Sequence, residues 1–392
     1  MHRSARFSGT WPALAGALAL ALAGPAPAAP RDQARRMHDR LVGVPPSSAA
    51  LAAMEALIAA GNPAGAADLA MGHPDFYRSA LKSWVTPWSN VDRTPFAPLN
   101  DYTATVIGVI RDERPFTDVL SADLVYVGTA AANVSPYSQT SNQHYDELEA
   151  NRIDLSNPQL FTGVPQSTLP NSQLASNDTA GVLTTRAAGE AFFSAGTNRR
   201  MFRFTAMNYL CRDMEALNDV TRPVDRIRQD VTRSPGGDSS IFHNTCTGCH
   251  SGMDPMAGAF AYFEWDESTS RVVHTPGQVQ PKYLINASVF PYGHVTTNNR
   301  WDNYWRSGQN AYLNWRGPAS GGFGAKSLGV EIASTRAFSE CQVQKVFERV
   351  CFRPPGNQAD RDEVQRIADA FEADNHNLKT VFAEIATYCM GQ

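Results

Sequence analysis

The sequence predicts a mainly α-helical protein, because apolar residues recur at helical spacing near both ends of the chain and glycine or proline closes most of these runs. With 43% hydrophobic and 18% charged residues, the 392-residue chain is too apolar for disorder and long enough for two or three structural units. Its net charge of −4 provides no basic excess to release phosphate counterions, so nucleic acid is excluded as a partner.

The first residues predict a leader. Arg3 and Arg6 are positively charged, the run from Trp11 to Gly24 is apolar, and Ala-Pro-Ala at 26–28 offers a small-residue cleavage site. This pattern predicts a signal peptide over residues 1–28, cut after Ala28, and therefore a periplasmic or secreted protein. No later run is long and apolar enough to span a bilayer, so no integral membrane segment is expected after cleavage.

Helices are expected throughout an N-terminal region, residues 29–128. Ser47 or Ser48 can cap a helix from Ala49 to Ala60, which Gly61 ends. Further helices are predicted at 63–71, 76–85, 101–110 and 117–127. Residues 129–180 are rich in Ser, Asn, Gln and Pro without periodicity, which predicts a long irregular loop segment.

Helical spacing returns at residues 186–195 and 199–217. In the second run Met207, Cys211 and Met214 recur at three and four residues, which indicates one buried stripe. The C-terminal region, residues 331–392, predicts a three-helix segment in an up-down-up arrangement. Its helices are expected at 339–351, 361–372 and 378–389.

Residues 246–250 read Cys-Thr-Gly-Cys-His, the Cys-X-X-Cys-His pattern to which c-type haem is attached. The thiols of Cys246 and Cys249 can add to the two vinyl groups of one haem, and His250 is then held against the iron as its proximal ligand. One covalent haem c is therefore the predicted cofactor, and residues 181–330 form the predicted multi-helix haem domain. A zinc site is disfavoured because the other cysteines lack a second close pair. A thioredoxin-like dithiol would leave His250 unexplained.

The chemistry of such an iron depends on its sixth position. A methionine there favours electron transfer, a histidine lowers the reduction potential, and an open position allows peroxide or oxygen chemistry. Five residues are candidates for this position. Met253 and Met256 follow the motif, Met207 and Met214 lie on the predicted helix before it, and His294 lies in a glycine-bearing loop.

Two further clusters flank the motif. Four arginines could pair with haem propionates or form a solvated face: Arg222, Arg226, Arg228 and Arg233. Five aromatic residues could cover the haem edge, bind a partner or pack between helices: Trp301, Tyr304, Trp305, Tyr312 and Trp315. In this reading Trp301 and Trp305 lie one helical turn apart.

The other four cysteines would face an oxidising compartment, where three pairings are open to them. Cys341 and Cys351 would stand about 15 Å apart on one helix, which is beyond the reach of a single bridge. In the up-down-up segment the first and third helices end side by side, which predicts a disulfide between Cys351 and Cys389. Cys211 would then pair with Cys341, and the alternative is that some of these residues remain buried thiols.

The stretch CTGCHSGMDPMAGAFAYFE at 246–264 resembles the haem segment of secreted cytochrome c-like proteins best known from planctomycetes. Gly-Val-Leu-Thr at 181–184 and Asn-Arg-Arg at 198–200 resemble the entry of that module, and AFSECQVQKVFERVCFRPP at 337–355 resembles its helical tail. The resemblance implies a secreted haem protein, and the domains of that family have no defined function.

These observations predict a monohaem c-type cytochrome that binds haem and passes single electrons to a redox partner protein. One alternative is a haem enzyme, peroxidase-like or oxidase-like, with an open distal iron site. Another is a binding module with an aromatic docking patch and haem as an electron port. Electron transfer is favoured over catalysis, no residue is assigned a catalytic role, and the sequence carries no signal for an oligomeric state.

Overall fold

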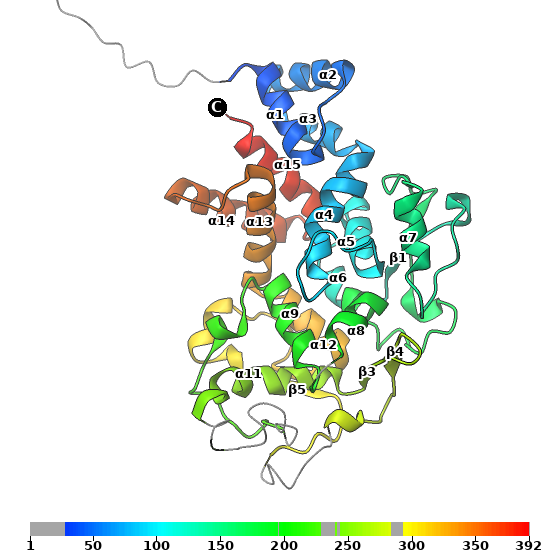
Figure 1. Ribbon diagram of the computed structural model, residues 1–392. Helices are drawn as coiled ribbons and strands as arrows, with labels where there is room; N and C mark the ends of the chain where they lie inside the picture. The colour runs from blue at the N-terminus through cyan, green and yellow to red at the C-terminus, as the bar shows by residue number, and fades with distance from the viewer. Residues whose placement is uncertain (1–27, 195, 229–239, 241–243, 284–292, 392) are drawn as a thin grey trace, which may run out of the picture.

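The computed structural model describes residues 28–194, 196–228, 240, 244–283 and 293–391. These residues form a mainly helical protein, as predicted, with three short two-stranded sheets (Figure 1). Nearly all of the predicted signal peptide lies outside the described residues. In the part of the chain that the structure describes, no helix combines the length and the apolar character that crossing a membrane requires.

The two ends of the chain pack together. Helices α1 (Pro30–Val42), α2 (Ser48–Ala59) and α3 (Pro63–Met71) form the N-terminal group, in which the Ser47 hydroxyl accepts the N-terminal hydrogen bond expected for α2. Helix α15 (Leu378–Cys389) lies against α1 and α3, as Figure 1 shows at the top of the molecule. A single helical unit therefore contains residues from both termini.

The structure of the C-terminal segment contains the three predicted helices. They are α13 (Arg336–Cys351), α14 (Gln358–Ala373) and α15. The disulfide Cys351–Cys389 joins the ends of α13 and α15 with a Cα–Cα distance of 5.6 Å, and Cys211–Cys341 forms the second bridge at 5.4 Å. Both predicted pairings are confirmed.

The middle of the N-terminal region is built around α5 (Asp101–Arg111), which is buried along its whole length. A π-helix (Phe76–Leu81) and α4 (Lys82–Val85) precede α5, and α6 (Asp118–Ser121) follows it. The helix predicted at 117–127 is wrong beyond its first turn, because residues 125–128 form strand β1 (Val125–Gly128). The Tyr126 ring of β1 packs so closely over Gly108 of α5 that a Cβ there would lie 2.1 Å from it.

Residues 129–180 are less irregular than predicted. Strand β2 (Phe161–Val164) pairs antiparallel with β1, and α7 (Gln143–Ala150) packs beside them. The sequence of α7 has no clear apolar periodicity, because only His144, Tyr145 and Leu148 of its eight residues are buried. The His144 side chain accepts a hydrogen bond from the backbone of Gly128, 2.9 Å away, which ties α7 to the strand.

The region around the Cys-X-X-Cys-His motif contains α8 (Arg186–Phe192), α9 (Arg199–Tyr209), α11 (Thr247–Ala257) and α12 (Gly324–Ala333). Two antiparallel strand pairs complete it, β3 (Phe263–Asp266) with β4 (Arg271–His274) and β5 (Arg300–Asp302) with β6 (Gly321–Phe323). The single helix predicted at 199–217 is wrong. Helix α9 ends at Tyr209 because Cys211 takes a left-handed conformation (φ 52°), and a separate 3₁₀ helix covers Met214–Leu217.

Other 3₁₀ helices connect these elements, at Thr86–Trp88, Ala130–Ala132, Gln166–Thr168, Gly181–Thr184, Gly258–Phe260, Pro281–Tyr283, Tyr304–Arg306 and Gln309–Leu313.

Candidate haem site

The Cys-X-X-Cys-His motif forms the first turn of α11. Cys246 occupies the N-cap position, and its carbonyl accepts a hydrogen bond from the His250 backbone at 3.1 Å. Cys246, Cys249 and His250 stand at positions i, i+3 and i+4, so they share one face of the helix. Both cysteines are half-buried free thiols. The motif therefore presents two thiols and one imidazole together.

A cavity of about 600 Å³ adjoins Cys249 and His250 of this face, and Cys246 stands outside its lining. Its volume is within the size range typical of ligand sites. Cys249, His250 and Met253 contribute one wall from α11, and α9 with the 3₁₀ helix after it contributes Met207 and Met214. The remaining lining residues are Val91, Arg93, Arg199, Arg200, Arg203, Phe204 and Glu215. Three of the five candidates for the sixth iron position thus share a cavity with His250.

The other two candidates lie elsewhere. Met256 is fully buried in the hydrophobic core and does not line the cavity. His294 lines a separate cavity of about 160 Å³ with Arg226 and Arg228. Burial, reinforced by these two arginines, lowers the pKa of His294 to about 4, so the imidazole is neutral at physiological pH.

Asp254 orients the His250 ring through a hydrogen bond with its Nδ1 atom. Its Nδ1 lies 2.9 Å from Asp254 Oδ1, and Arg199 of α9 binds the same carboxylate through Nε at 2.7 Å and Nη2 at 2.8 Å. Burial opposes the charge of Asp254, but Arg199 and His250 outweigh burial and hold the pKa of this carboxyl well below its usual range. Since Nδ1 is engaged with a carboxylate, iron ligation would use Nε2.

The environment of the Cys249 thiol disfavours its thiolate form. Burial first, and Glu215 second, raises the pKa of Cys249, whereas reactive redox cysteines have a lowered pKa. The Cys249 thiol instead points toward the Met214 carbonyl, 3.4 Å away.

The described members of the predicted arginine cluster do not line this cavity. Arg222 pairs with Asp219, Arg226 pairs with Asp302, and Arg228 is buried with its guanidinium 5.1 Å from the centre of the Tyr283 ring. None of these three lines the 600 Å³ cavity. Arg226 binds Asp302 of β5, Arg222 donates to the Ser307 hydroxyl, and Arg228 lines the cavity of His294. Arg233 lies outside the described residues.

Four other arginines line the cavity: Arg93, Arg199, Arg200 and Arg203. Arg203 pairs with Asp213 at 2.6 Å, Arg200 donates to the Ser194 hydroxyl at 2.8 Å, and Arg93 reaches the Asn208 amide oxygen at 3.4 Å. Guanidinium groups at a cavity rim can bind carboxylates through charge-assisted hydrogen bonds. The available sequence signal was the spacing of 199, 200 and 203 on the helix that carries Met207, whereas nothing local marked Arg93.

The aromatic patch does not form a surface. Trp301 and Trp305 are completely buried, and Tyr312, with 56% of its surface exposed, is the most exposed of the five aromatic residues. Trp301 lies in β5 and Trp305 in a 3₁₀ helix, so the expected single helix is wrong. The Trp305 ring packs against Phe202 with ring centres 5.8 Å apart, which supports α11 and α9 from behind the cavity.

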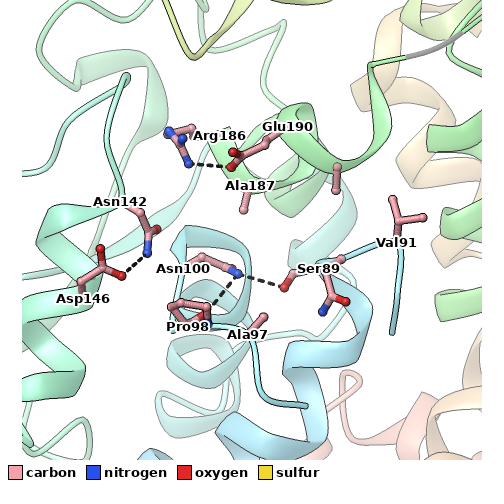
Figure 2. A pocket seen from close by; sticks show the side chains of 12 residues that line it. Ser89, Val91, Ala97, Pro98, Asn100, Asn142, Asp146, Arg186, Ala187 and Glu190 are labelled. Atoms are coloured by element: carbon pink, nitrogen blue, oxygen red, sulfur yellow. Dashed lines mark hydrogen bonds and ion pairs between the residues drawn. The ribbon is translucent and has the colours of Figure 1, made fainter. Parts of the chain in front are cut away.

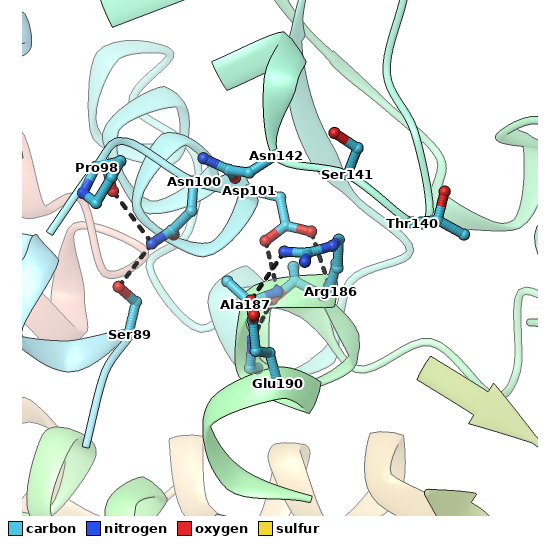
Figure 3. Close-up of polar contacts among 12 residues, drawn as sticks. Ser89, Pro98, Asn100, Asp101, Thr140, Ser141, Asn142, Arg186, Ala187 and Glu190 are labelled. Atoms are coloured by element: carbon cyan, nitrogen blue, oxygen red, sulfur yellow. Dashed lines mark hydrogen bonds and ion pairs between the residues drawn. The ribbon is translucent and has the colours of Figure 1, made fainter. Parts of the chain in front are cut away.

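A second cavity, of about 410 Å³, adjoins the first because Val91 lines both. Its polar wall groups are paired with one another, as Figure 2 shows: Asn142 with Asp146 at 2.7 Å, and Arg186 with Glu190 at 2.9 Å. Behind this wall the buried Asp101 accepts hydrogen bonds from the backbone of Arg186 and Ala187 and joins α5 to the start of α8 (Figure 3).

Comparison of the chain with family models, curated proteins and solved structures found no match. Among residues 28–391, leaving aside the undescribed gaps, no group of three or more His, Cys, Asp or Glu side chains is arranged to hold a metal ion. Three features of this chain fit haem c: the shared face of Cys246, Cys249 and His250, the adjoining cavity, and its arginine rim.

Proposed function

We propose that this chain is a monohaem c-type cytochrome that passes single electrons between partner proteins outside the cytoplasm. The observation that carries the proposal is the position of the Cys-X-X-Cys-His turn at the start of α11, beside a cavity of about 600 Å³. Haem c bound there would supply one-electron exchange between ferric and ferrous iron. The leader pattern and the resemblance to secreted cytochrome c-like proteins support the location.

Different residues of the chain would bind the different parts of the haem. Cys246 and Cys249 would hold it covalently, and His250 would bind the iron through Nε2. Met207 and Met214, which line the same cavity as His250 from α9 and the 3₁₀ helix after it, would be the thioethers available to the iron. Of the cavity arginines, Arg93 and Arg200 would neutralise the propionates, because Arg199 and Arg203 already bind Asp254 and Asp213.

Covalent haem is tested with the full chain produced in a host that attaches c-type haem. The purified protein should keep its haem absorption after denaturation and acid-acetone extraction. The double variant Cys246→Ala/Cys249→Ala should lose it, while the matched double variant Cys351→Ala/Cys389→Ala should retain it. A wild-type chain without covalent haem, or a motif variant that keeps it, would refute the proposal.

The second candidate is a haem enzyme with an open distal position, peroxidase-like or oxidase-like. The observation that favours it is the neighbouring cavity of about 410 Å³, which shares Val91 with the cavity of His250 and where a small substrate would bind. Electron paramagnetic resonance of the oxidised protein separates the two functions. A low-spin, six-coordinate iron agrees with the carrier, and a high-spin iron with rapid peroxide reactivity establishes the enzyme.

A further inference from the structure

We infer that Asp254 is a positioning residue that fixes the tautomer of His250 and lowers the reduction potential of an iron bound to it. The inference rests on the proposed haem site and extends it to a tuning mechanism. Its basis is a chain of three side chains from two helices, in which His250 and Asp254 belong to α11 and Arg199 belongs to α9.

The geometry leaves Asp254 little freedom. Its side chain is fully buried, and one carboxylate oxygen accepts from both His250 Nδ1, at 2.9 Å, and Arg199 Nε, at 2.7 Å. The second oxygen accepts from Arg199 Nη2 at 2.8 Å. His250 and Asp254 stand four residues apart on one helix, so the backbone itself keeps the imidazole and the carboxylate together.

This contact decides which nitrogen of His250 carries the proton. A carboxylate accepts but does not donate, so the proton of the neutral imidazole must reside on Nδ1, and Nε2 keeps its lone pair for the iron. The carboxylate also draws the Nδ1 proton toward itself, which makes the ring a stronger electron donor. A stronger donor stabilises ferric iron relative to ferrous iron and therefore lowers the potential.

Arg199 limits this effect. Because its two-point contact neutralises much of the carboxylate charge, Asp254 withdraws the imidazole proton less strongly than an isolated carboxylate would. Asp254 therefore lowers the reduction potential and Arg199 weakens this effect. Replacing each residue in turn is expected to shift the potential in opposite directions.

The test uses the full chain loaded with haem. Asp254→Asn keeps the shape of the side chain but removes its charge, so the reduction equilibrium should move toward ferrous iron by about tenfold, which equals about 59 mV upward for one electron. The iron–histidine stretching frequency of the ferrous protein should fall. A mere loosening that admits water would stabilise the more highly charged ferric state and lower the potential, so the sign of the shift identifies the mechanism.

Arg199→Gln provides the second arm, which keeps the inference testable if Asp254→Asn does not fold. It leaves the carboxylate in place without its counter-charge, so the potential should fall and the stretching frequency should rise. An Arg199→Gln protein with an unchanged or higher potential overturns the inference.

Asp219→Asn is the matched control. Asp219 is also a buried aspartate paired with an arginine, Arg222 at 3.2 Å, and its backbone carbonyl accepts from Ser251 of α11 at 3.0 Å, yet its carboxylate does not contact His250. Its replacement should leave the potential unchanged. Haem-loaded Asp254→Asn with the wild-type potential and stretching frequency overturns only the inference, whereas a wild-type chain that binds no haem overturns the proposed function.

Discussion

Gly252 is the position at which packing behind the haem site can be tested most directly. It lies in α11 two residues after His250, and a Cβ added there would lie 1.9 Å from Nε1 and 2.2 Å from Cε2 of Trp305. Trp305 is fully buried and packs against Phe202, so its ring cannot swing into solvent. Gly252→Ala therefore forces α11 and the ring apart.

Two effects of opposite sign decide the stability of this variant. Helix propensity alone predicts that Gly252→Ala stabilises the protein by about 1 kcal/mol. Two non-bonded carbon atoms lie about 3.5 Å apart at their optimal separation, so the added methyl group must displace the ring or the helix by more than about 1 Å. Forcing a methyl group into a packed core costs about 1–3 kcal/mol. The net expectation is a destabilisation of about 0–2 kcal/mol.

Urea unfolding of the haem-loaded protein measures this difference through the midpoint, with an unchanged slope indicating that the unfolded state is unaffected. The second arm of the assay repeats Gly252→Ala in a Trp305→Leu background, where the ring no longer blocks the methyl group. The two changes should then be coupled by about 1–3 kcal/mol in the favourable direction. A Gly252→Ala protein that is more stable than wild type, or the absence of coupling, would refute the packing argument.

Three further predictions concern other parts of the molecule. Replacing Cys351 and Cys389 by alanine opens a loop with a sequence separation of 38 residues and should lower the free energy of unfolding by about 4 kcal/mol, measured by urea unfolding without reductant. His294 has a folded pKa of about 4, below its ordinary value of about 6.5, so the folded state binds fewer protons and stability should fall by up to about 3 kcal/mol as pH drops from about 6.5 to about 4. His294→Gln should flatten this profile, and an identical pH profile in the variant would contradict the assignment. Met256→Leu should leave the haem absorption spectrum unchanged, because Met256 is in the core, whereas Met214→Leu should abolish a methionine–iron charge-transfer band if Met214 is the sixth ligand.

The sequence was sufficient where local chemistry decides the structure. Glycine, proline and a capping serine define the limits of α2 and α3, and helix length alone excludes a Cys341–Cys351 bridge. The order of the C-terminal helices then predicted Cys351–Cys389, which is present, and these features depend on residues within one or two helices of each other. The second bridge, Cys211–Cys341, is also present, but it joins residues 130 positions apart and was predicted only as the pair that remained.

The sequence was insufficient where contacts with distant segments decide the secondary structure. Periodicity alone gives residues 125–128 a helical reading, but their pairing with 161–164 makes them a strand. The buried tryptophans at 301 and 305 were read as one helical turn for the same reason, since a strand and a 3₁₀ helix around them depend on contacts with β6 and α11. Arg93 could not be found because it reaches the cavity from more than 100 residues before α9.

The turn at Cys211 explains why the candidate haem cavity could not be derived from the motif alone. The stripe of Met207, Cys211 and Met214 has helical spacing, and an unbroken helix would place all three on one buried face. The left-handed conformation at Cys211 and its disulfide to Cys341 break that helix, so Met207 and Met214 reach the cavity from two different elements. The three residues of the proposed haem attachment are therefore defined by local spacing, whereas the methionines that face them across the cavity are placed by a cross-link to the C-terminal helices. For this reason the spacing of the motif alone could predict Cys246, Cys249 and His250 as a group but not the opposite wall of the cavity.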